Sequence, residues 1–468
     1  MIGLTPDQGA AVHSAAENLL EHTGFEVRHP GLLRLAAQAG ARVDEPGGRV
    51  RVPPALLREL IGRAPARYAI AGATGREWQV GSKDQHCVAI VTDPWILDYQ
   101  TQQGRRPCLA DVRRHTRVAQ RLDEVAAISL MDYPVEDVHG ASSNLRAMEE
   151  HLLNHGKHIY VLPTSVESLD RWLRLGRVLL NGRELRGSRL MTVGVAVLSP
   201  LTLTGMNGEL LLRACEHDLP VVPTICPMAG TTAPYSKAGI LLLGHAEALF
   251  MAALTQMVRP GHPFIYVQGL SRTDLRTGED LYYTLDKVLW KLASVQLGKA
   301  CGLPTAAECG GTMSPRYDLQ AGAESALFML SAAQSGADLL SGIGSCYNAV
   351  GMSPEMMVVQ SAWLCAARFM QAGIDTSTHL GLESIAQAGP GGHFLEDPMT
   401  VELMRGDEFF GCDLFDYEWG QDRPALLDRA HQRVEELAAD SASPLPEPVQ
   451  EELRRFFGQE RTRLADKA

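Results

Sequence analysis

The feature that most constrains the fold of this chain is a regular alternation of short apolar runs and longer amphipathic stretches between residues 125 and 343. Each run has the length of a buried strand, and each stretch between runs has the periodicity of a helix. A strand, a helix and a second strand in that order are typical of a βαβ unit, whose strands are parallel. The seven runs are residues 125–131, 158–163, 190–198, 220–226, 263–268, 304–308 and 337–343.

This series predicts an α/β protein built on a closed (β/α)8 barrel of the TIM type, which typically needs about 250 residues. An open, doubly wound sheet is the competing arrangement. No eighth strand is evident from the sequence. We expect the barrel to span residues 121–420, with a mixed α+β elaboration over residues 1–120 and a helical tail over residues 421–468.

The first 120 residues contain helix signals and short strand-like pieces. Thr5 can cap a helix that runs to about Gly24. The pieces at residues 68–71, 87–91 and 95–99 are punctuated by glycine and aspartate, as hairpins require. We therefore expect hairpins packed on the barrel, with Asp98 and Tyr99 on their surface.

Composition excludes several classes of protein. The 468 residues are 45% apolar and 21% charged, as in an ordinary globular chain. The net charge of −12 argues against a nucleic-acid-binding protein, whose affinity rests on neutralising phosphates. No apolar run approaches the ~20 residues of a membrane span, and the start lacks the features of a secretion signal. Nine cysteines without a pattern predict reduced thiols in the cytoplasm.

A barrel places its chemistry at the C-terminal ends of its strands. The residues that follow the runs include several tyrosines, amides and carboxylates but few basic side chains. This mouth suits a small cationic or zwitterionic ligand, because quaternary ammonium groups bind to aromatic faces. The candidate residues there are Tyr133, Tyr266, Gln268, Glu308, Cys346, Tyr347 and Asn348.

Common catalytic motifs are absent from the sequence. It contains no Walker A loop, no GxGxxG after a strand and no GxSxG. It also lacks CxxC and HExxH, so no metal site is predicted. Cys346 could be a nucleophile or a buried structural thiol. Glu308 could be catalytic or could take part in a helix cap or salt bridge.

The order of several motifs resembles the trimethylamine methyltransferase superfamily from about residue 4 to residue 440. The motifs are residues 229–234 (Ala-Gly-Thr-Thr-Ala-Pro), 259–263 (Arg-Pro-Gly-His-Pro), 274–278 (Asp-Leu-Arg-Thr-Gly) and 389–395 (Gly-Pro-Gly-Gly-His-Phe-Leu). The resemblance implies a (β/α)8 barrel that moves a methyl group from a methylated amine to the cobalt of a separate corrinoid protein. It also implies no tightly bound cofactor, because the cobalamin that accepts the methyl group is carried by the partner.

The archetype of this family carries pyrrolysine after the seventh strand, which corresponds here to residues 342–351. This chain has no pyrrolysine, and Ser345, Cys346, Tyr347 and Asn348 occupy the segment. It resembles the pyrrolysine-lacking branch, which implies a quaternary amine substrate such as glycine betaine in one-carbon metabolism related to methanogenesis.

The resemblance suggests roles for the candidate residues. A cage of Tyr133, Tyr266 and Tyr347, with Phe394, would strip water from the cation. Gln268, Asn348 or His393 would hold a substrate carboxylate. We expect Glu308, Tyr347 and His393 to be catalytic and Cys346 to contact the substrate.

Three features depart from the family pattern. Residues 308–311 (Glu-Cys-Gly-Gly) replace a glycine-rich stretch, and His245 stands at an asparagine-like position. The segment after the seventh run also differs from the Met-Leu-Glu-Ser-Gly type of run in pyrrolysine-lacking relatives. Two other functions stay open. One is a lyase or hydrolase that uses Glu308 and Cys346 without corrinoid, and the other is a non-catalytic barrel that binds methylated amines. The tail from Pro424 could serve an interface in a homo-oligomer.

Overall fold

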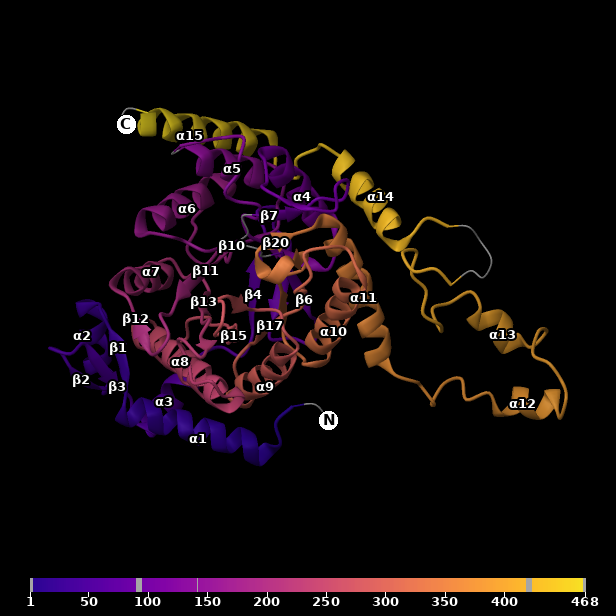
Figure 1. Ribbon diagram of the computed structural model, residues 1–468, viewed down its shortest axis with the longest axis horizontal. Helices are drawn as coiled ribbons and strands as arrows, with labels where there is room; N and C mark the ends of the chain where they lie inside the picture. Colours follow the sequence, from indigo (N-terminus) through magenta and orange to yellow (C-terminus); the bar gives the residue numbers. More distant parts are fainter. Residues whose placement is uncertain (1–2, 90–94, 141, 418–422, 466–468) are drawn as a thin grey trace.

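The computed structural model describes residues 3–89, 95–140, 142–417 and 423–465, and its centre is a curled sheet of seven parallel strands (Figure 1). The strand order is β13-β11-β10-β9-β6-β18-β17. The α/β class and the parallel pairing predicted from the sequence are therefore confirmed. The strands are β6 (His86–Ala89), β9 (Val125–Ile128), β10 (His158–Val161), β11 (Met191–Ala196), β13 (Val221–Thr224), β17 (Ala306–Glu308) and β18 (Leu339–Ser341).

The two edge strands of this sheet are both hydrogen-bonded to the segment at residues 263–266. The Ile265 N–H donates to the Val221 carbonyl at 3.0 Å, on the β13 side. The Tyr266 N–H donates to the Pro304 carbonyl at 2.8 Å, on the β17 side. The predicted run at 263–268 thus lies between the two edges through isolated parallel bridges.

Strand β6 corrects one expectation. The piece at residues 87–91 was expected in an N-terminal hairpin, but β6 runs parallel to β9 and β18 in the middle of the large sheet. The strand is covered on both faces, because the side chains of Cys87, Val88 and Ala89 are all buried. Its sequence is therefore a short apolar run in which polar and apolar residues do not alternate. Residues 90 and 91 lie outside the described residues. The other two pieces do form hairpins. One pairs β4 (Tyr68–Ala71) with β5 (Glu77–Val80), and the other pairs β7 (Trp95–Leu97) with β8 (Gly104–Arg105).

Helices follow the strands and surround the sheet (Figure 1). Side chains that accept a hydrogen bond from the first turn cap many of them, as Ser165, Ser236 and Asp318 do. The helices are α4 (Leu109–Arg121), α5 (Ser142–Leu153), α6 (Val166–Leu179), α7 (Gly205–Glu216), α8 (Lys237–Val258), α9 (Asp286–Ala300), α10 (Leu319–Gln334) and α11 (Pro354–Ala372).

Helix α8 is the longest and most buried of these helices. Its 22 residues are long and apolar enough to cross a membrane by length and composition, contrary to the expectation that no apolar run approaches this length. In the structure 83% of its most apolar window is buried. It packs against α1 and α3 on one side and α9 on another, so it is a core helix.

A buried carboxylate on α8 should make the stability depend on pH. Glu247 accepts hydrogen bonds from Ser199 Oγ and the Leu201 N–H, both at 2.8 Å. Burial outweighs these bonds and raises the pKa of Glu247 to about 7. The folded protein then binds more protons than the unfolded chain between about pH 4.5 and 7. The free energy of unfolding should therefore fall by roughly 2–3 kcal/mol from this group as pH rises through that window.

Urea denaturation at pH 5 and pH 8 measures this effect. Glu247→Gln should be more stable than the parent at pH 8 and should lose most of the pH dependence. Glu216→Gln, at an exposed position, is the matched control and should keep it. Equal pH dependence in the parent and Glu247→Gln would contradict the prediction.

The N-terminal elaboration packs on the outside of α8. It contains α1 (Pro6–His22), α2 (Pro30–Gln38) and α3 (Pro54–Ile61). A small sheet in the order β12-β1-β3-β2 includes β2 (Arg42–Asp44) and β3 (Arg49–Arg51). Thr5 caps α1 in a reciprocal capping box with Gln8, as its sequence position predicts. Strand β1 (Phe25–Val27) pairs with β12 (Thr202–Leu203), so this region is joined to the loop that follows β11.

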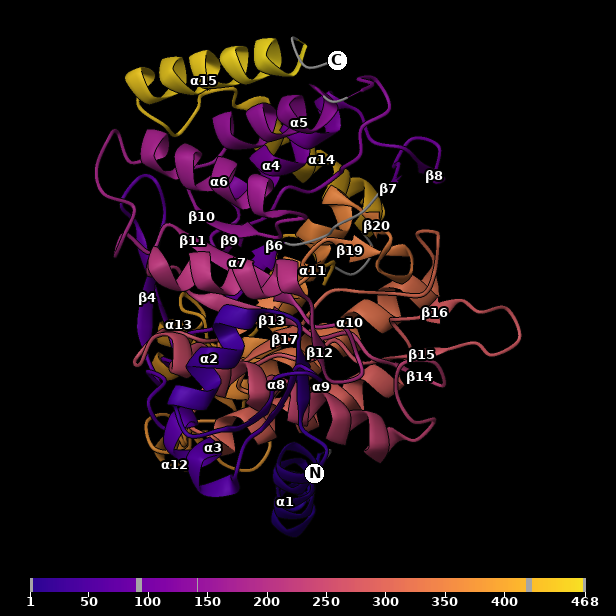
Figure 2. The ribbon, with the colours of Figure 1, turned by 90° about the vertical axis from the view of Figure 1, so that its left-hand side faces the viewer.

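The C-terminal part first leaves the body and then returns to it. Residues 373–417, hereafter the arm, carry α12 (Leu382–Ala388) and α13 (Pro398–Leu403) away from the sheet and its surrounding helices (Figure 1). Helices α14 (Leu426–Ala439) and α15 (Glu447–Ala465) then form the tail, on either side of Pro444. Figure 2 shows α15 lying across α5 and α6. The domain limits at residues 120 and 420 stay predictions.

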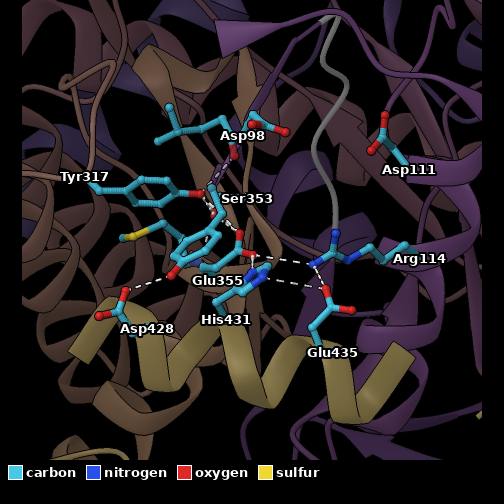
Figure 3. A network of polar contacts seen from close by, with 12 residues as sticks. Asp98, Asp111, Arg114, Tyr317, Ser353, Glu355, Asp428, His431 and Glu435 are labelled. Carbon is cyan, nitrogen blue, oxygen red and sulfur yellow. Dashed lines mark hydrogen bonds and ion pairs between the residues drawn. The ribbon is translucent and has the colours of Figure 1, made fainter. Parts of the chain in front are cut away.

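A polar cluster fastens α14 to the barrel (Figure 3). Glu355, at the start of α11, is buried and accepts a hydrogen bond from His431 Nδ1 of α14 at 2.9 Å. The Tyr317 hydroxyl lies 3.1 Å from the same carboxylate. The Tyr99 ring stacks on His431 at 3.7 Å, and its hydroxyl donates to Asp428 at 2.7 Å. Tyr99 is half-buried, at a junction between the β7–β8 hairpin, the start of α11 and the tail.

Candidate functional site

A cavity of about 840 Å³ lies at the C-terminal ends of the parallel strands. Thr224, Glu308 and Ser341, the last residues of β13, β17 and β18, line it. Five aromatic side chains contribute to the wall: Trp95, Tyr160, Tyr282, Tyr283 and Tyr347. This volume is in the range of small-molecule sites.

Two small sheets hold these aromatic residues over the ends of the strands. One has the order β14-β15-β16 and begins with β14 (Met228–Ala229). Its hairpin of β15 (Ser271–Thr273) and β16 (Asp280–Leu281) leads directly into Tyr282. The other has the order β19-β20-β7-β8 and combines the segment after β18, with β19 (Ser345–Cys346), and the N-terminal hairpin. In it, β7 (Trp95–Leu97) pairs in parallel with β20 (Gly351–Met352), which brings Trp95 to the cavity.

Glu308 is the most constrained charged residue of the cavity. Its Oε1 accepts a hydrogen bond from the Tyr282 hydroxyl at 3.0 Å and lies 3.1 Å from Lys287 Nζ. Lys287 Nζ also donates to the Leu270 carbonyl at 3.0 Å. Lys291, one helical turn further along α9, donates from Nζ to the Glu308 carbonyl at 2.7 Å. The carboxylate is therefore paired within a largely buried cluster.

The same cluster holds one buried ammonium group, that of Lys287 itself. Lys287 Nζ lies 3.2 Å from the centroid of the Tyr282 ring. A cation at this position is attracted by the quadrupole of the ring. The Tyr282 face and the Glu308 carboxylate together form an environment for a desolvated ammonium.

Burial and charge act in opposite directions on Glu308. Burial would raise the pKa of this carboxyl, but the charges of Lys287 and Lys291 outweigh burial and hold it below its ordinary value. Burial lowers the pKa of Lys291 to about 7. Burial, and then the Glu308 charge, raise the pKa of the Tyr282 hydroxyl well above its ordinary value. Glu308 is thus an anion at neutral pH, and Tyr282 stays a hydrogen-bond donor.

The two glycines after Glu308 allow this packing. A Cβ on Gly310 would lie 2.0 Å from the Gly342 carbonyl oxygen. Gly311 has φ +136°, and a Cβ there would lie 2.3 Å from the Tyr283 ring. The two glycines therefore let the segment after Glu308 pack directly against Gly342 and the Tyr283 ring, where a side chain would clash.

The segment at residues 347–349 forms a tight left-handed turn at the cavity. Tyr347, Asn348 and Ala349 all have positive φ, at 48°, 53° and 62°. This conformation is unfavourable for residues other than glycine and is often found at functional sites. The Asn348 side chain bonds to the backbone at both ends of its amide: it donates to the Asp280 carbonyl at 2.6 Å and accepts from the Tyr282 N–H at 2.8 Å. Asn348 thus positions the hairpin that carries Tyr282.

The structure brings together only three of the predicted site residues, Glu308, Tyr347 and Asn348. Tyr266 and Gln268 point the other way, toward α8: the Tyr266 hydroxyl contacts His245 Nδ1 at 2.7 Å, and Gln268 Nε2 donates to that hydroxyl. Tyr133 packs against Val112 and Val135, outside the cavity. The expected cage of Tyr133, Tyr266 and Tyr347 is therefore not assembled.

Three other predicted residues also lie away from the cavity. Cys346 is fully buried and does not line it. His393 and Phe394 are exposed and lie in the chain between α12 and α13, the two helices that stand apart from the sheet in Figure 1. The catalytic role of His393 and the substrate contacts of Cys346 and Phe394 stay predictions.

Sequence reasoning missed Tyr282, Tyr283, Tyr160, Trp95 and Lys287. Tyr282 and Tyr283 were overlooked because only residues immediately after each run were considered, and the β15–β16 hairpin intervenes. One signal was available: Lys287 and Lys291 are four residues apart, so they share one face of a helix in which cations need a buried partner. That partner is Glu308.

The chain was compared with known proteins. A family model described as trimethylamine methyltransferase matches residues 1–465. A trimethylamine methyltransferase of Desulfitobacterium hafniense is 23% identical over 408 residues, which cover 86% of this chain and 82% of that protein. A glycine betaine methyltransferase from another strain of that species is 24% identical over 466 residues, 97% of this chain and 96% of that protein.

One solved structure shares the overall fold. The crystal structure of the monomethylamine methyltransferase of Methanosarcina barkeri aligns with a TM-score of 0.51 at 14% identity. The alignment covers 93% of this chain and 88% of that protein. At this identity the likeness supports the architecture and carries no information on the substrate.

Proposed function

Since the chain belongs to the trimethylamine methyltransferase family, we propose that it transfers a methyl group from a small quaternary or tertiary methylated amine to the cobalt of a separate corrinoid protein. Glycine betaine is the proposed type of substrate. The observation that carries the proposal is the cavity of five aromatic side chains around the Glu308–Lys287 pair. We further infer that residues 263–266 complete an eight-membered barrel between β13 and β17.

The proposed reaction is an in-line displacement at a methyl carbon. Cobalt(I) supplies the electron pair of the new cobalt–carbon bond, and the pair of the broken carbon–nitrogen bond stays on nitrogen. Cobalt becomes formally cobalt(III), and a quaternary substrate leaves as a neutral tertiary amine. A quaternary substrate needs no proton, whereas a tertiary amine reacts as its protonated ammonium and leaves as a neutral secondary amine. In both cases the protein must desolvate a cation and orient one methyl group.

The charge balance of the cavity suits this reaction. Methyl transfer removes the positive charge of the ammonium, so contacts that favour the cation in the ground state slow the step. Lys287 already neutralises much of the Glu308 charge. Aromatic faces then provide most of the attraction, which is weaker than that of a free carboxylate.

A spectroscopic assay tests the proposal. The protein is mixed with reduced free cobalamin and a panel of quaternary, tertiary and secondary methylated amines, and the cobalt(I) absorbance is followed. Conversion to methylcobalamin with one amine supports the proposal, and the same assay with a corrinoid protein tests the partner. The proposal is rejected if no amine in the panel lowers the cobalt(I) absorbance, either with free cobalamin or with a corrinoid protein.

The aromatic wall predicts a difference between two tyrosines. Tyr347→Leu should raise KM about tenfold by removing a cation–π contact, whereas Tyr347→Phe should keep KM close to that of the parent. Tyr133→Leu should leave KM unchanged, because Tyr133 packs outside the cavity. Steady-state kinetics with the amine found in the panel measure this. An unchanged KM in Tyr347→Leu would contradict the role of the aromatic wall, and a raised KM in Tyr133→Leu would instead support the cage expected from the sequence.

We also propose that the arm makes a homo-oligomer. Large apolar side chains are exposed along it, among them Ile374, Leu382, Leu395 and Phe409. Such a surface needs permanent cover. A corrinoid partner has to dissociate in each cycle, so a second copy of this chain is the better occupant of this surface.

The nine cysteines are free thiols, which supports the proposal that the protein acts in the reducing cytoplasm.

A further inference from the structure

Three side chains of metal-binding type meet where α1 crosses α8 and the end of α9. His13 lies on α1, His245 in α8, and Cys301 directly after α9. Their ligand atoms all lie within 4.8 Å of one another. None of the three lines the large cavity, so the cluster is separate from the proposed methyl-transfer site.

The spacing of these atoms fits a tetrahedral ion. Zinc binds nitrogen at about 2.0 Å and sulfur at about 2.3 Å, which places two nitrogens roughly 3.3 Å apart and nitrogen and sulfur roughly 3.6 Å apart. In the structure His13 Nδ1 is 3.1 Å from His245 Nε2, and Cys301 Sγ is 3.8 Å from His13 Nδ1. Small shifts of flexible side chains would give all three atoms bonding distances to one ion.

Each histidine is also held by a polar partner at its other ring nitrogen. His13 Nε2 lies 3.5 Å from Glu17 Oε1, and Arg58 fixes that carboxylate with two hydrogen bonds of 2.7 Å. His245 Nδ1 contacts the Tyr266 hydroxyl at 2.7 Å. Such partners orient the ring and leave the opposite nitrogen free to bind a metal, as in known zinc sites.

The protonation chemistry and access agree with this reading. Burial lowers the pKa of His245 to about 3, which keeps the ring neutral. Burial raises the pKa of the Cys301 thiol to about 11, so a metal ion would have to displace its proton, as zinc does in thiolate sites. The His13 side chain is 30% exposed, which provides a route from solvent and room for a water molecule.

We propose that His13, His245 and Cys301 bind a Zn²⁺ ion, with water as the fourth ligand, and that this ion fastens α1 to α8 and α9. The mixed nitrogen and sulfur ligands favour zinc over magnesium or calcium, which prefer oxygen. The alternative is a plain hydrogen bond between the two imidazoles, in which Cys301 has no role.

Metal binding to the full chain decides between these readings. The protein is stripped with a chelator and titrated with Zn²⁺ and Co²⁺, and bound metal is measured by elemental analysis. We expect one equivalent per chain, a thiolate-to-cobalt charge-transfer band, visible bands typical of tetrahedral Co²⁺, and a rise in the melting temperature. None of these readouts depends on methyl transfer.

Variants identify the ligands. Cys301→Ser should abolish the charge-transfer band and weaken Zn²⁺ binding at least 100-fold, and His245→Asn should weaken it similarly. Glu17→Gln should weaken binding about tenfold, since Glu17 only orients His13. Cys365→Ser changes an exposed thiol outside the cluster and should bind like the parent. Absence of stoichiometric metal in the parent, or parent-like binding by Cys301→Ser, would overturn the proposal. If a variant does not fold, the spectrum of the Co²⁺-loaded parent protein still shows whether a thiolate binds the metal.

Discussion

Replacing Glu308 with glutamine is expected to lower kcat/KM for the methylated amine about 100-fold. The glutamine keeps an acceptor for the Tyr282 hydroxyl but leaves Lys287 without its carboxylate. The substrate ammonium would then share a low-dielectric cavity with an unpaired cation. Two like charges about 5 Å apart repel by roughly 3 kcal/mol at an effective dielectric near 20, which corresponds to about a 100-fold loss of affinity.

The same substitution should also lower the stability of the protein. Removing one partner of a buried ion pair typically costs roughly 3–5 kcal/mol, because the other charge stays buried and unpaired. Lys287 is almost completely buried and has few other partners among the described residues. Urea denaturation of the parent and Glu308→Gln measures this loss independently of any methyl-transfer assay.

A double variant separates the charge effect from the shape effect. Lys287→Met together with Glu308→Gln removes both charges, so it should recover most of the stability and part of the affinity lost in Glu308→Gln. Glu279→Gln is the matched control, because Glu279 also lines the cavity but is exposed. If Glu308→Gln and the double variant were equally impaired, Glu308 would have to act on the substrate directly rather than by neutralising Lys287.

Charged residues on the arm are expected to convert the proposed oligomer into a monomer. Leu382 and Ile385 lie on α12 with 71% and 59% of their surfaces exposed. Glutamates at both positions would bury unpaired charges in an apolar interface. The protein should therefore be fully monomeric at micromolar concentration. Light scattering coupled to size-exclusion chromatography measures the change. The fold of the body should be unaffected, because no residue of α12 is buried within the chain.

The control for the arm uses a leucine of similar exposure elsewhere. Leu275, in the turn of the β15–β16 hairpin, is 61% exposed, and Leu275→Glu should keep the parent's oligomeric state. A monomeric parent would contradict the proposal directly. An arm variant that stays oligomeric would assign the interface to another surface.

Part of the site could be predicted from the sequence because strand ends can be located from local pattern. Glu308, Tyr347 and Asn348 follow apolar runs, and all three line the cavity. Tyr266 and Gln268 satisfied the same rule and yet face α8. Successive side chains of an extended strand point to opposite faces, so Val267 lines the cavity while its two neighbours do not. Knowing where an apolar run begins and ends does not tell which of its side chains face the cavity.

The sequence by itself determined the α/β class, the series of parallel strands and the family resemblance, because these are written in local periodicity and in ordered motifs. Only the tertiary structure decided that β6 lies inside the large sheet and that the β15–β16 hairpin brings Tyr282 to Glu308. It also decided that His13, His245 and Cys301 meet, although 232 residues separate the two histidines. Contacts of this kind depend on how distant elements pack together, and no periodicity within one segment records that packing.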